Sequence, residues 1–143
     1  MKISRFLTAT ALASAAFEGP VITGSDALQR YLQLAQGSAR IELVRVLYLT
    51  ARHRLIRDEI ASRGTIDEAV LHVREVLARA LELGAAAIVL VHNHPSGDPT
   101  PSKADLDMTR RLAVTGKGLG IDLLDHLIVV RAGMTSFRAQ GLL

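Results

Sequence analysis

The sequence predicts a single α/β domain in which a central mixed β-sheet lies between layers of helices, a three-layer α-β-α arrangement. Apolar, strand-like runs alternate with segments of helical periodicity along most of the 143 residues. That length suits one domain with a genuine hydrophobic core. A buried strand that follows a helix also ends in polar residues, and α/β folds usually place their sites at such strand ends.

A helix and a β-hairpin are expected first. Ser25 is suited to be the N-cap of the helix and Gly37 to end it. Residues 41–50 are apolar and β-branched enough for a central strand, and residues 54–62 alternate like its hairpin partner. The apolar face of the helix is expected to hold Leu28, Tyr31, Leu32 and Ala35.

The remaining elements alternate between helix and strand. A helix over 69–83, ended by Gly84, precedes the buried strand AAAIVLV at 85–91. A helix over 103–115 and strands over 121–131 and 134–137 complete the sheet. The glycine-rich segment GKGLG follows a helix and does not lead from a strand into a helix N-terminus, so it predicts a plain turn instead of a phosphate loop. The apolar stripe of the 69–83 helix is expected to hold Val73, Val76, Leu77, Ala80 and Leu81.

The stretch HNHPSGDPTPSKAD, residues 92–105, predicts a metal site. His92 and His94 end the buried strand, and alternate side chains of an extended chain point the same way, so both imidazoles can converge on one ion. Asp105 is placed to be a third ligand because the proline-rich turn lets the chain fold back. Two histidines and a carboxylate suit Zn²⁺, and three protein ligands leave a fourth position for water. The absence of cysteine excludes thiolate zinc sites.

A purely structural interpretation covers part of this stretch. Ser102 followed by Asp105 is also a good helix start, with a serine N-cap and an acidic residue three positions on, as in a capping box. The histidine pair is not explained in this way, because two neutral imidazoles at the mouth of a buried strand need hydrogen-bond partners and add little to a core.

The spacing of His92, His94, Ser102 and Asp105 resembles the signature of the JAMM metallopeptidases, also called the JAB or MPN-plus family. The strings HNHPSGDPTPS, RGTID at 63–67, RE at 74–75 and DHLIV at 125–129 are similar to its bacterial RadC-like branch, which is associated with DNA repair. The resemblance runs from about Val21 to the C-terminus. It implies a JAMM/MPN-type domain over 25–143, with a cytidine-deaminase-like sheet, preceded by a helical or ragged extension over 1–24.

The resemblance also implies an activity, namely zinc-dependent hydrolysis of an amide or isopeptide bond in a peptide or protein substrate. His92, His94 and Asp105 would bind zinc, Glu59 would be the general base, and Ser102 would donate a hydrogen bond to the oxyanion. Without the resemblance, Glu59 is better explained as a solvated edge-strand carboxylate paired with Arg57 or Arg63. His126, in DHLIV, either supports a ligand or is a buried histidine satisfied by a neighbouring carboxylate, which is the commoner case.

Two other functions stay open. A DNA-binding module is suggested by a pI of 9.8 and by an arginine cluster at 52–63, but the net charge is only +3, aromatic residues make up 3%, and the helix-hairpin-helix region typical of RadC-like proteins is missing. Salt-sensitive retention on DNA would distinguish it. The other is a binding scaffold that keeps the metal without catalysis. A zinc deaminase is disfavoured because its signature needs cysteine.

The compartment is expected to be the cytoplasm, with no membrane partner. No apolar run reaches the roughly 18 residues that span a bilayer, and zero cysteines are compatible with a reducing environment. The first residues mimic a secretory signal, but Thr8, Thr10 and Ser14 interrupt their apolar stretch.

Overall fold

The computed structural model describes residues 26–64 and 73–143, which form a five-stranded mixed sheet in the order β2-β1-β3-β4-β5. β3 and β4 run parallel, and the other neighbouring pairs are antiparallel. The strands are β1 (Leu43–Leu49), β2 (Leu55–Arg63), β3 (Ala87–Asn93), β4 (Asp122–Val130) and β5 (Gly133–Ser136). The helices are α2 (Asp26–Leu32), continued by the π-helical turn η2 (Gln33–Gly37), α3 (Val73–Glu82) and α4 (Lys103–Gly118).

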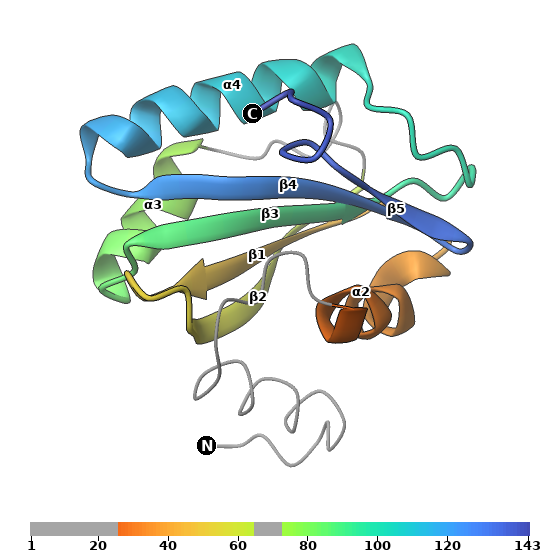
Figure 1. The fold of residues 1–143 in the computed structure, drawn as a ribbon, viewed down its shortest axis with the longest axis horizontal. Helices are drawn as coiled ribbons and strands as arrows, with labels where there is room; N and C mark the ends of the chain where they lie inside the picture. The colour runs from red at the N-terminus through yellow and green to blue at the C-terminus, as the bar shows by residue number, and fades with distance from the viewer. Residues whose placement is uncertain (1–25, 65–72) are drawn as a thin grey trace.

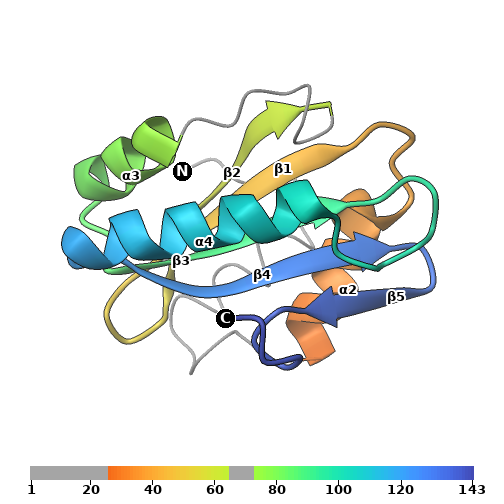
Figure 2. The same ribbon diagram turned by 90° about the horizontal axis from the view of Figure 1, so that it is seen from above.

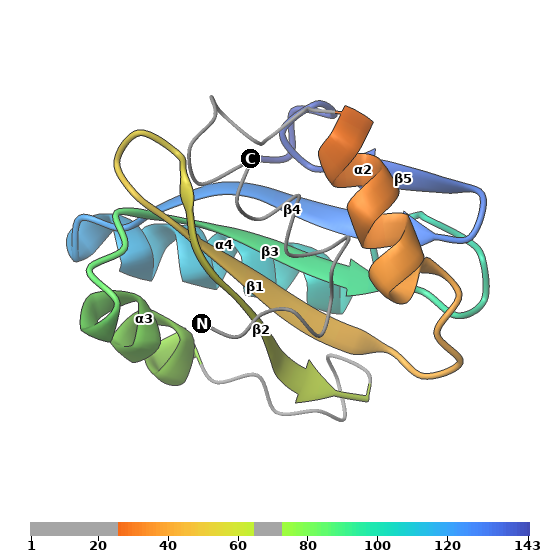
Figure 3. The same cartoon turned by 90° about the horizontal axis from the view of Figure 1, so that it is seen from below.

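Helices cover both faces of this sheet, which confirms the three-layer arrangement (Figure 1). Helices α3 and α4 lie across one face (Figure 2), and α2 crosses the other (Figure 3). Each face has its own buried apolar cluster, because successive side chains of a strand point to opposite sides. Thus Leu90 packs beneath α3 and α4, whereas Val89 and Val91 pack towards α2.

The central strand β3 is buried at all seven positions, as expected of a strand covered on both faces. Helix α4 connects β3 to its parallel neighbour β4 and packs on the face that Leu90 and His92 share. The C-terminal end of β3 therefore meets the N-terminal end of α4. This junction brings His92 and Asp105 together.

Helix α4 is capped at both ends. Ser102 is its N-cap, with the reciprocal hydrogen bonds of a capping box to Asp105. The helix extends to Gly118, beyond the expected end at residue 115, and closes with Gly120 at φ 76° and a bond from Ile121 N–H to the Gly116 carbonyl. A Cβ on Gly116 would lie 2.7 Å from the carbonyl oxygen of Ile121. Gly116, Lys117 and Gly118 thus belong to α4, so the predicted turn is limited to Leu119 and Gly120.

Two predicted core positions are wrong. Ala35 is exposed and Gln36 is buried in its place, because the chain widens into a π-helical turn after Leu32 and shifts the buried face by one residue. Leu81, near the end of α3, is 56% exposed, whereas the other four predicted stripe residues of this helix are buried.

The predicted 1–24 extension, the Ser25 N-cap and the start of the 69–83 helix lie outside the described residues. Within 26–64 and 73–143, no helix is both long and apolar enough to cross a membrane.

Candidate metal centre

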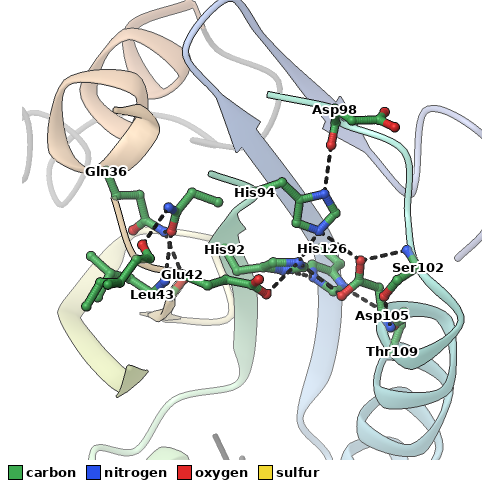
Figure 4. Close-up of polar contacts among 12 residues, drawn as sticks. Gln36, Glu42, Leu43, His92, His94, Asp98, Ser102, Asp105, Thr109 and His126 are labelled. Carbon is green, nitrogen blue, oxygen red and sulfur yellow. Dashed lines mark hydrogen bonds and ion pairs between the residues drawn. The ribbon is translucent and has the colours of Figure 1, made fainter. Parts of the chain in front are cut away.

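Four side chains converge where β3 ends, namely those of Glu42, His92, His94 and Asp105, and their ligand atoms all lie within 4.8 Å of one another (Figure 4). His92 Nε2 lies 3.0 Å from His94 Nε2 and 3.0 Å from Asp105 Oδ1. Asp105 Oδ2 lies 3.1 Å from His94 Nε2. The structure therefore brings the three ligands expected from the sequence together and adds a second carboxylate.

Burial closes the group on one side and leaves it accessible on the other. The side chain of His92 is fully buried and that of Asp105 is 2% exposed. His94 and Glu42 retain 15% and 11% exposure. A ligand from solvent would therefore approach past His94 and Glu42.

The tautomer of His94 follows from its second nitrogen. Nδ1 lies 2.8 Å from the backbone carbonyl oxygen of Asp98, which can only accept, so Nδ1 carries the proton and donates it. In the neutral ring this leaves a lone pair on Nε2, aimed at the group. The carboxylate of Asp105, together with the Asp98 carbonyl, raises the pKa of His94 and so favours its charged form when no other cation is present.

The tautomer of His92 is set by a buried relay through His126 and Thr109. Thr109 Oγ1 donates to the Asp105 carbonyl at 2.7 Å, so it accepts from His126 Nδ1 at 2.5 Å. Burial lowers the pKa of His126 well below its ordinary value, so the ring is neutral and its Nε2 is an acceptor. His92 Nδ1 donates to it at 2.7 Å, leaving a lone pair on His92 Nε2.

With both rings neutral, the Nε2 lone pairs of His92 and His94 face the Asp105 carboxylate at 3.0 and 3.1 Å, so a proton or another cation must lie between them. The Asp105 carboxylate is kept ionised: burial alone would raise its pKa, but hydrogen bonds with His92 and His94 bring the pKa well below its ordinary range. Two neutral imidazole nitrogens and an ionised carboxylate form a donor set able to hold a divalent metal ion.

Glu42 is the member of the group that the sequence analysis missed. It precedes β1, and its Oε2 lies 3.8 Å from His92 Nε2, farther than the oxygens of Asp105. Glu42 lies two residues before Val44, so their side chains point to the same side of the sheet. Val44 is paired with His92, so the side chains of Glu42 and His92 both face α4. A single acidic residue at the start of a mostly apolar strand was the available signal, but it indicates a site only when β1 is known to neighbour β3.

The structure does not bring Glu59 to this group. Glu59 lies on the edge strand β2, opposite Val46, and pairs with Arg79 of α3, its Oε2 2.7 Å from Arg79 Nη2. The hydrogen bonds from Arg79 lower the pKa of Glu59, in spite of an opposing effect of burial. Its surroundings match the interpretation as a paired edge-strand carboxylate: the expected partner Arg57 lies 3.5 Å away through Nη1, and Arg79 of α3 is a closer partner that was not foreseen.

Ser102 lies beside the group through its bonds to Asp105. Its backbone N–H donates to Asp105 Oδ2 at 2.8 Å, and its Oγ accepts from Asp105 N–H at 3.0 Å. The cap thus orients the carboxylate that faces both histidines. Because Oγ accepts in this bond, its own proton is left available to donate elsewhere.

The chain is thus an α/β domain in which two histidines and two carboxylates at the C-terminal end of a buried central strand form a group that could hold a metal ion. The chain is a member of the RadC-like JAB domain family, which it matches over residues 22–142. This confirms the resemblance seen in the sequence.

Among curated relatives, the chain is 49% identical over 123 residues to a UPF0758 protein of Ruegeria pomeroyi. It is 46% identical over 130 residues to a UPF0758 protein of Rhodobacter capsulatus. These matches cover 86% and 91% of this chain but only 55% and 61% of the two relatives. The chain therefore spans little more than half the length of the relatives it matches.

Proposed function

We propose that this domain is a zinc-dependent hydrolase that cleaves an amide or isopeptide bond in a peptide or protein. The observation that carries the proposal is the convergence of His92, His94 and Asp105 at 3.0–3.1 Å, with the Glu42 carboxylate 3.8 Å from His92 on the accessible side. Three close donors and one more distant carboxylate are what a metal-assisted hydrolase needs for binding an ion and for moving a proton.

The donor spacing fits zinc. Zinc–nitrogen and zinc–oxygen bonds of about 2.0–2.1 Å in a tetrahedron place neighbouring ligand atoms about 3.3 Å apart. The measured distances among the three donors lie slightly below this value, so a small expansion would complete the site. Zinc held there would polarise the scissile carbonyl and lower the pKa of a coordinated water to about 7.

Glu42 takes the role that the sequence analysis assigned to Glu59. In this proposal, Glu42 accepts a proton from the attacking water and passes it to the nitrogen of the departing amine. Such general acid–base transfer typically contributes about 10²–10⁴-fold to the rate. The Glu42 side chain is 11% exposed on the side of the group that solvent can reach, which supports contact with a substrate. Glu59, in contrast, forms an ion pair with Arg79.

Ser102 would stabilise the negative charge that develops on the carbonyl oxygen of the substrate. Its hydroxyl proton is not used by the helix cap, since Oγ is the acceptor from Asp105 N–H. A donor of this kind is worth about 10²–10³-fold in rate.

Metal content is the first test. The full chain, purified without chelator, is analysed for zinc alongside His92→Ala, Asp105→Ala and Asp107→Ala. Asp107 is the matched control, because it lies on the same helix and only pairs with Arg110 at the surface. We expect about one zinc per chain in wild type and Asp107→Ala, and loss in the other two variants. Wild-type protein that takes up no zinc, even when zinc is offered, would overturn the proposal.

Turnover is the second test. Zinc-loaded protein is screened against peptides and lysine-linked isopeptides. Cleavage that disappears with a chelator and returns with zinc supports a hydrolase. A zinc-loaded domain that cleaves none of them would favour a scaffold that retains the metal without catalysis.

A further inference from the structure

We infer that Asn93, the residue between the two histidines, is a positioning residue that holds Glu42 in place against His92. The inference deepens the proposed function and rests on it for the value of Glu42 in catalysis. Its basis is the set of hydrogen bonds that Asn93 makes to the backbone on either side of Glu42.

The side-chain amide of Asn93 bridges the two residues that flank Glu42. Asn93 Oδ1 accepts from Leu43 N–H at 2.8 Å, and Asn93 Nδ2 donates to the Ile41 carbonyl at 2.9 Å. A neighbouring strand would offer its peptide group to the same donor and acceptor. Because β3 ends at Asn93, its side-chain amide makes the two hydrogen bonds that a continuing strand backbone would have made.

The opposite edge of the same segment is held by β2. Gly64 N–H, directly after β2, donates to the Glu42 carbonyl at 2.7 Å. The backbone around Glu42 is therefore held from both sides within the sheet. A side chain held in this way stands roughly perpendicular to the sheet, and that of Glu42 faces the side occupied by His92.

Gln36 supports the bonds between Asn93 and the segment around Glu42 from the face of the sheet that α2 covers. Its Nε2 lies 3.2 Å from Asn93 Oδ1 and 3.1 Å from the Leu43 carbonyl oxygen, and its Oε1 accepts from Arg45 Nε at 2.6 Å. Asn93 and Gln36 are 0% and 1% exposed. Both amides have polar partners, so the orientation of Asn93 is well determined.

The position requires an amide. Aspartate would place a carboxylate oxygen, which can only accept, against the Ile41 carbonyl oxygen. Leucine, with the same branched side-chain skeleton, would leave the Leu43 N–H and the Ile41 carbonyl without this partner. The histidines at 92 and 94 do not use this side chain. Replacing Asn93 should therefore disturb Glu42 while the three donor residues remain.

The first arm of the test needs no metal. Amide hydrogen exchange is followed in chelator-treated wild type, Asn93→Leu and Val89→Ala. Val89→Ala is a control that removes buried volume from the face of β3 that Asn93 shares, without removing the bonds to Ile41 and Leu43. In Asn93→Leu, we expect Leu43 and Gly64 amides to exchange at least about tenfold faster relative to β4 amides. In Val89→Ala, this ratio should stay at its wild-type value. An unchanged Gly64 amide in Asn93→Leu would overturn the inference.

The second arm uses Co²⁺ alone as the probe, through its visible absorption. We expect Glu42→Gln to change the spectrum, Asn93→Leu to reproduce that change, and the double variant to add nothing, since a residue acting through Glu42 has no effect once Glu42 is altered. Val89→Ala should keep the wild-type spectrum. A wild-type spectrum in Asn93→Leu, with an altered one in Glu42→Gln, would overturn this inference and leave the proposed function standing. Wild-type protein that binds no Co²⁺ would overturn the proposed metal function, and amide exchange would still decide whether Asn93 holds the segment.

Discussion

His126 Nε2 lies 2.7 Å from His92 Nδ1, and both side chains are fully buried. This contact orients the His92 ring and fixes its tautomer, because the neutral His126 ring accepts the Nδ1 proton. The sequence left open whether His126 supports a ligand or is satisfied by a carboxylate. The structure shows Thr109 and His92 as its side-chain partners, so it stands behind the candidate metal centre.

Replacing His126 with phenylalanine should weaken zinc binding about 10–100-fold, the usual cost of losing a partner that orients a ligand. Phenylalanine keeps much of the ring volume but cannot accept from His92. Competition with a chromophoric chelator measures the affinity. Phe137→Leu is the control, since Phe137 stacks on His126 without contributing to the relay, and it should retain the wild-type affinity. Equal affinities in both variants and wild type would contradict this role.

The same substitution at two glutamates separates the two candidate bases. Glu42→Gln should keep about one zinc per chain while lowering the hydrolytic rate about 10²–10⁴-fold, because glutamine cannot accept the proton. Glu59→Gln weakens the pairing with Arg79 and should leave zinc content and rate at their wild-type values, with at most a small loss of stability. Zinc content and the rate of cleavage of a substrate from the isopeptide screen show which glutamate is the base. Loss of rate only in Glu59→Gln would reverse the assignment.

These two glutamates also show where sequence reasoning reached its limit. His92, His94 and Asp105 were predicted because their convergence is local: alternation along one strand and one turn into a helix place them together. Glu42 meets His92 through the pairing of β1 with β3, whose partners are far apart in sequence. The pattern predicted a central strand over 41–50 but did not show that β3 is its other neighbour, so it gave no reason to bring Glu42 to the histidines.

The fold was predictable to a similar extent and for a similar reason. Periodicity identified the strands and helices, because the spacing of apolar residues depends on whether one face or both faces of an element are buried. It did not foresee the π-helical turn that buries Gln36, because the gain comes from hydrogen bonds to Asn93 and Arg45 on other elements. The role inferred for Asn93 likewise depends on long-range hydrogen bonds, to Gln36 and to the backbone of Ile41 and Leu43.

Without metal, the stability of the domain should fall as the pH rises through the raised folded pKa of His94. The pKa of His94 is raised by Asp105, so the stabilisation is complete below its unfolded value of about 6.5 and is lost as the pH rises through the folded value. His126, whose folded pKa is lowered, opposes this fall only near pH 6.5, where the unfolded histidine still loses its proton; above about pH 7.5 it is neutral in both states and contributes no slope. Denaturant unfolding in the presence of a chelator measures the slope.

Asp105→Asn supplies the control for this pH dependence. Asparagine cannot attract the His94 imidazolium as a carboxylate does, so the fall in stability above about pH 6.5 should become shallower. Zinc should act in the opposite direction in wild type, because metal ligation needs neutral imidazoles and strengthens as they lose protons. A slope that is the same in wild type and Asp105→Asn would show that this pair does not set the pH dependence.

Three substitutions at Ser102 separate its structural role from the proposed catalytic one. Ser102→Ala removes both the cap and the hydroxyl, so it should lower the free energy of unfolding by about 1 kcal/mol and the hydrolytic rate about 10²–10³-fold. Ser102→Thr retains both groups and should behave like wild type. Ser102→Asp can accept from Asp105 N–H as a cap but has no hydroxyl proton, so it should recover stability without recovering rate. Denaturant unfolding and zinc-loaded turnover are measured on the same preparations. Full activity in Ser102→Ala would restrict Ser102 to the helix cap, because the rate would then be independent of the donor that the proposed mechanism requires.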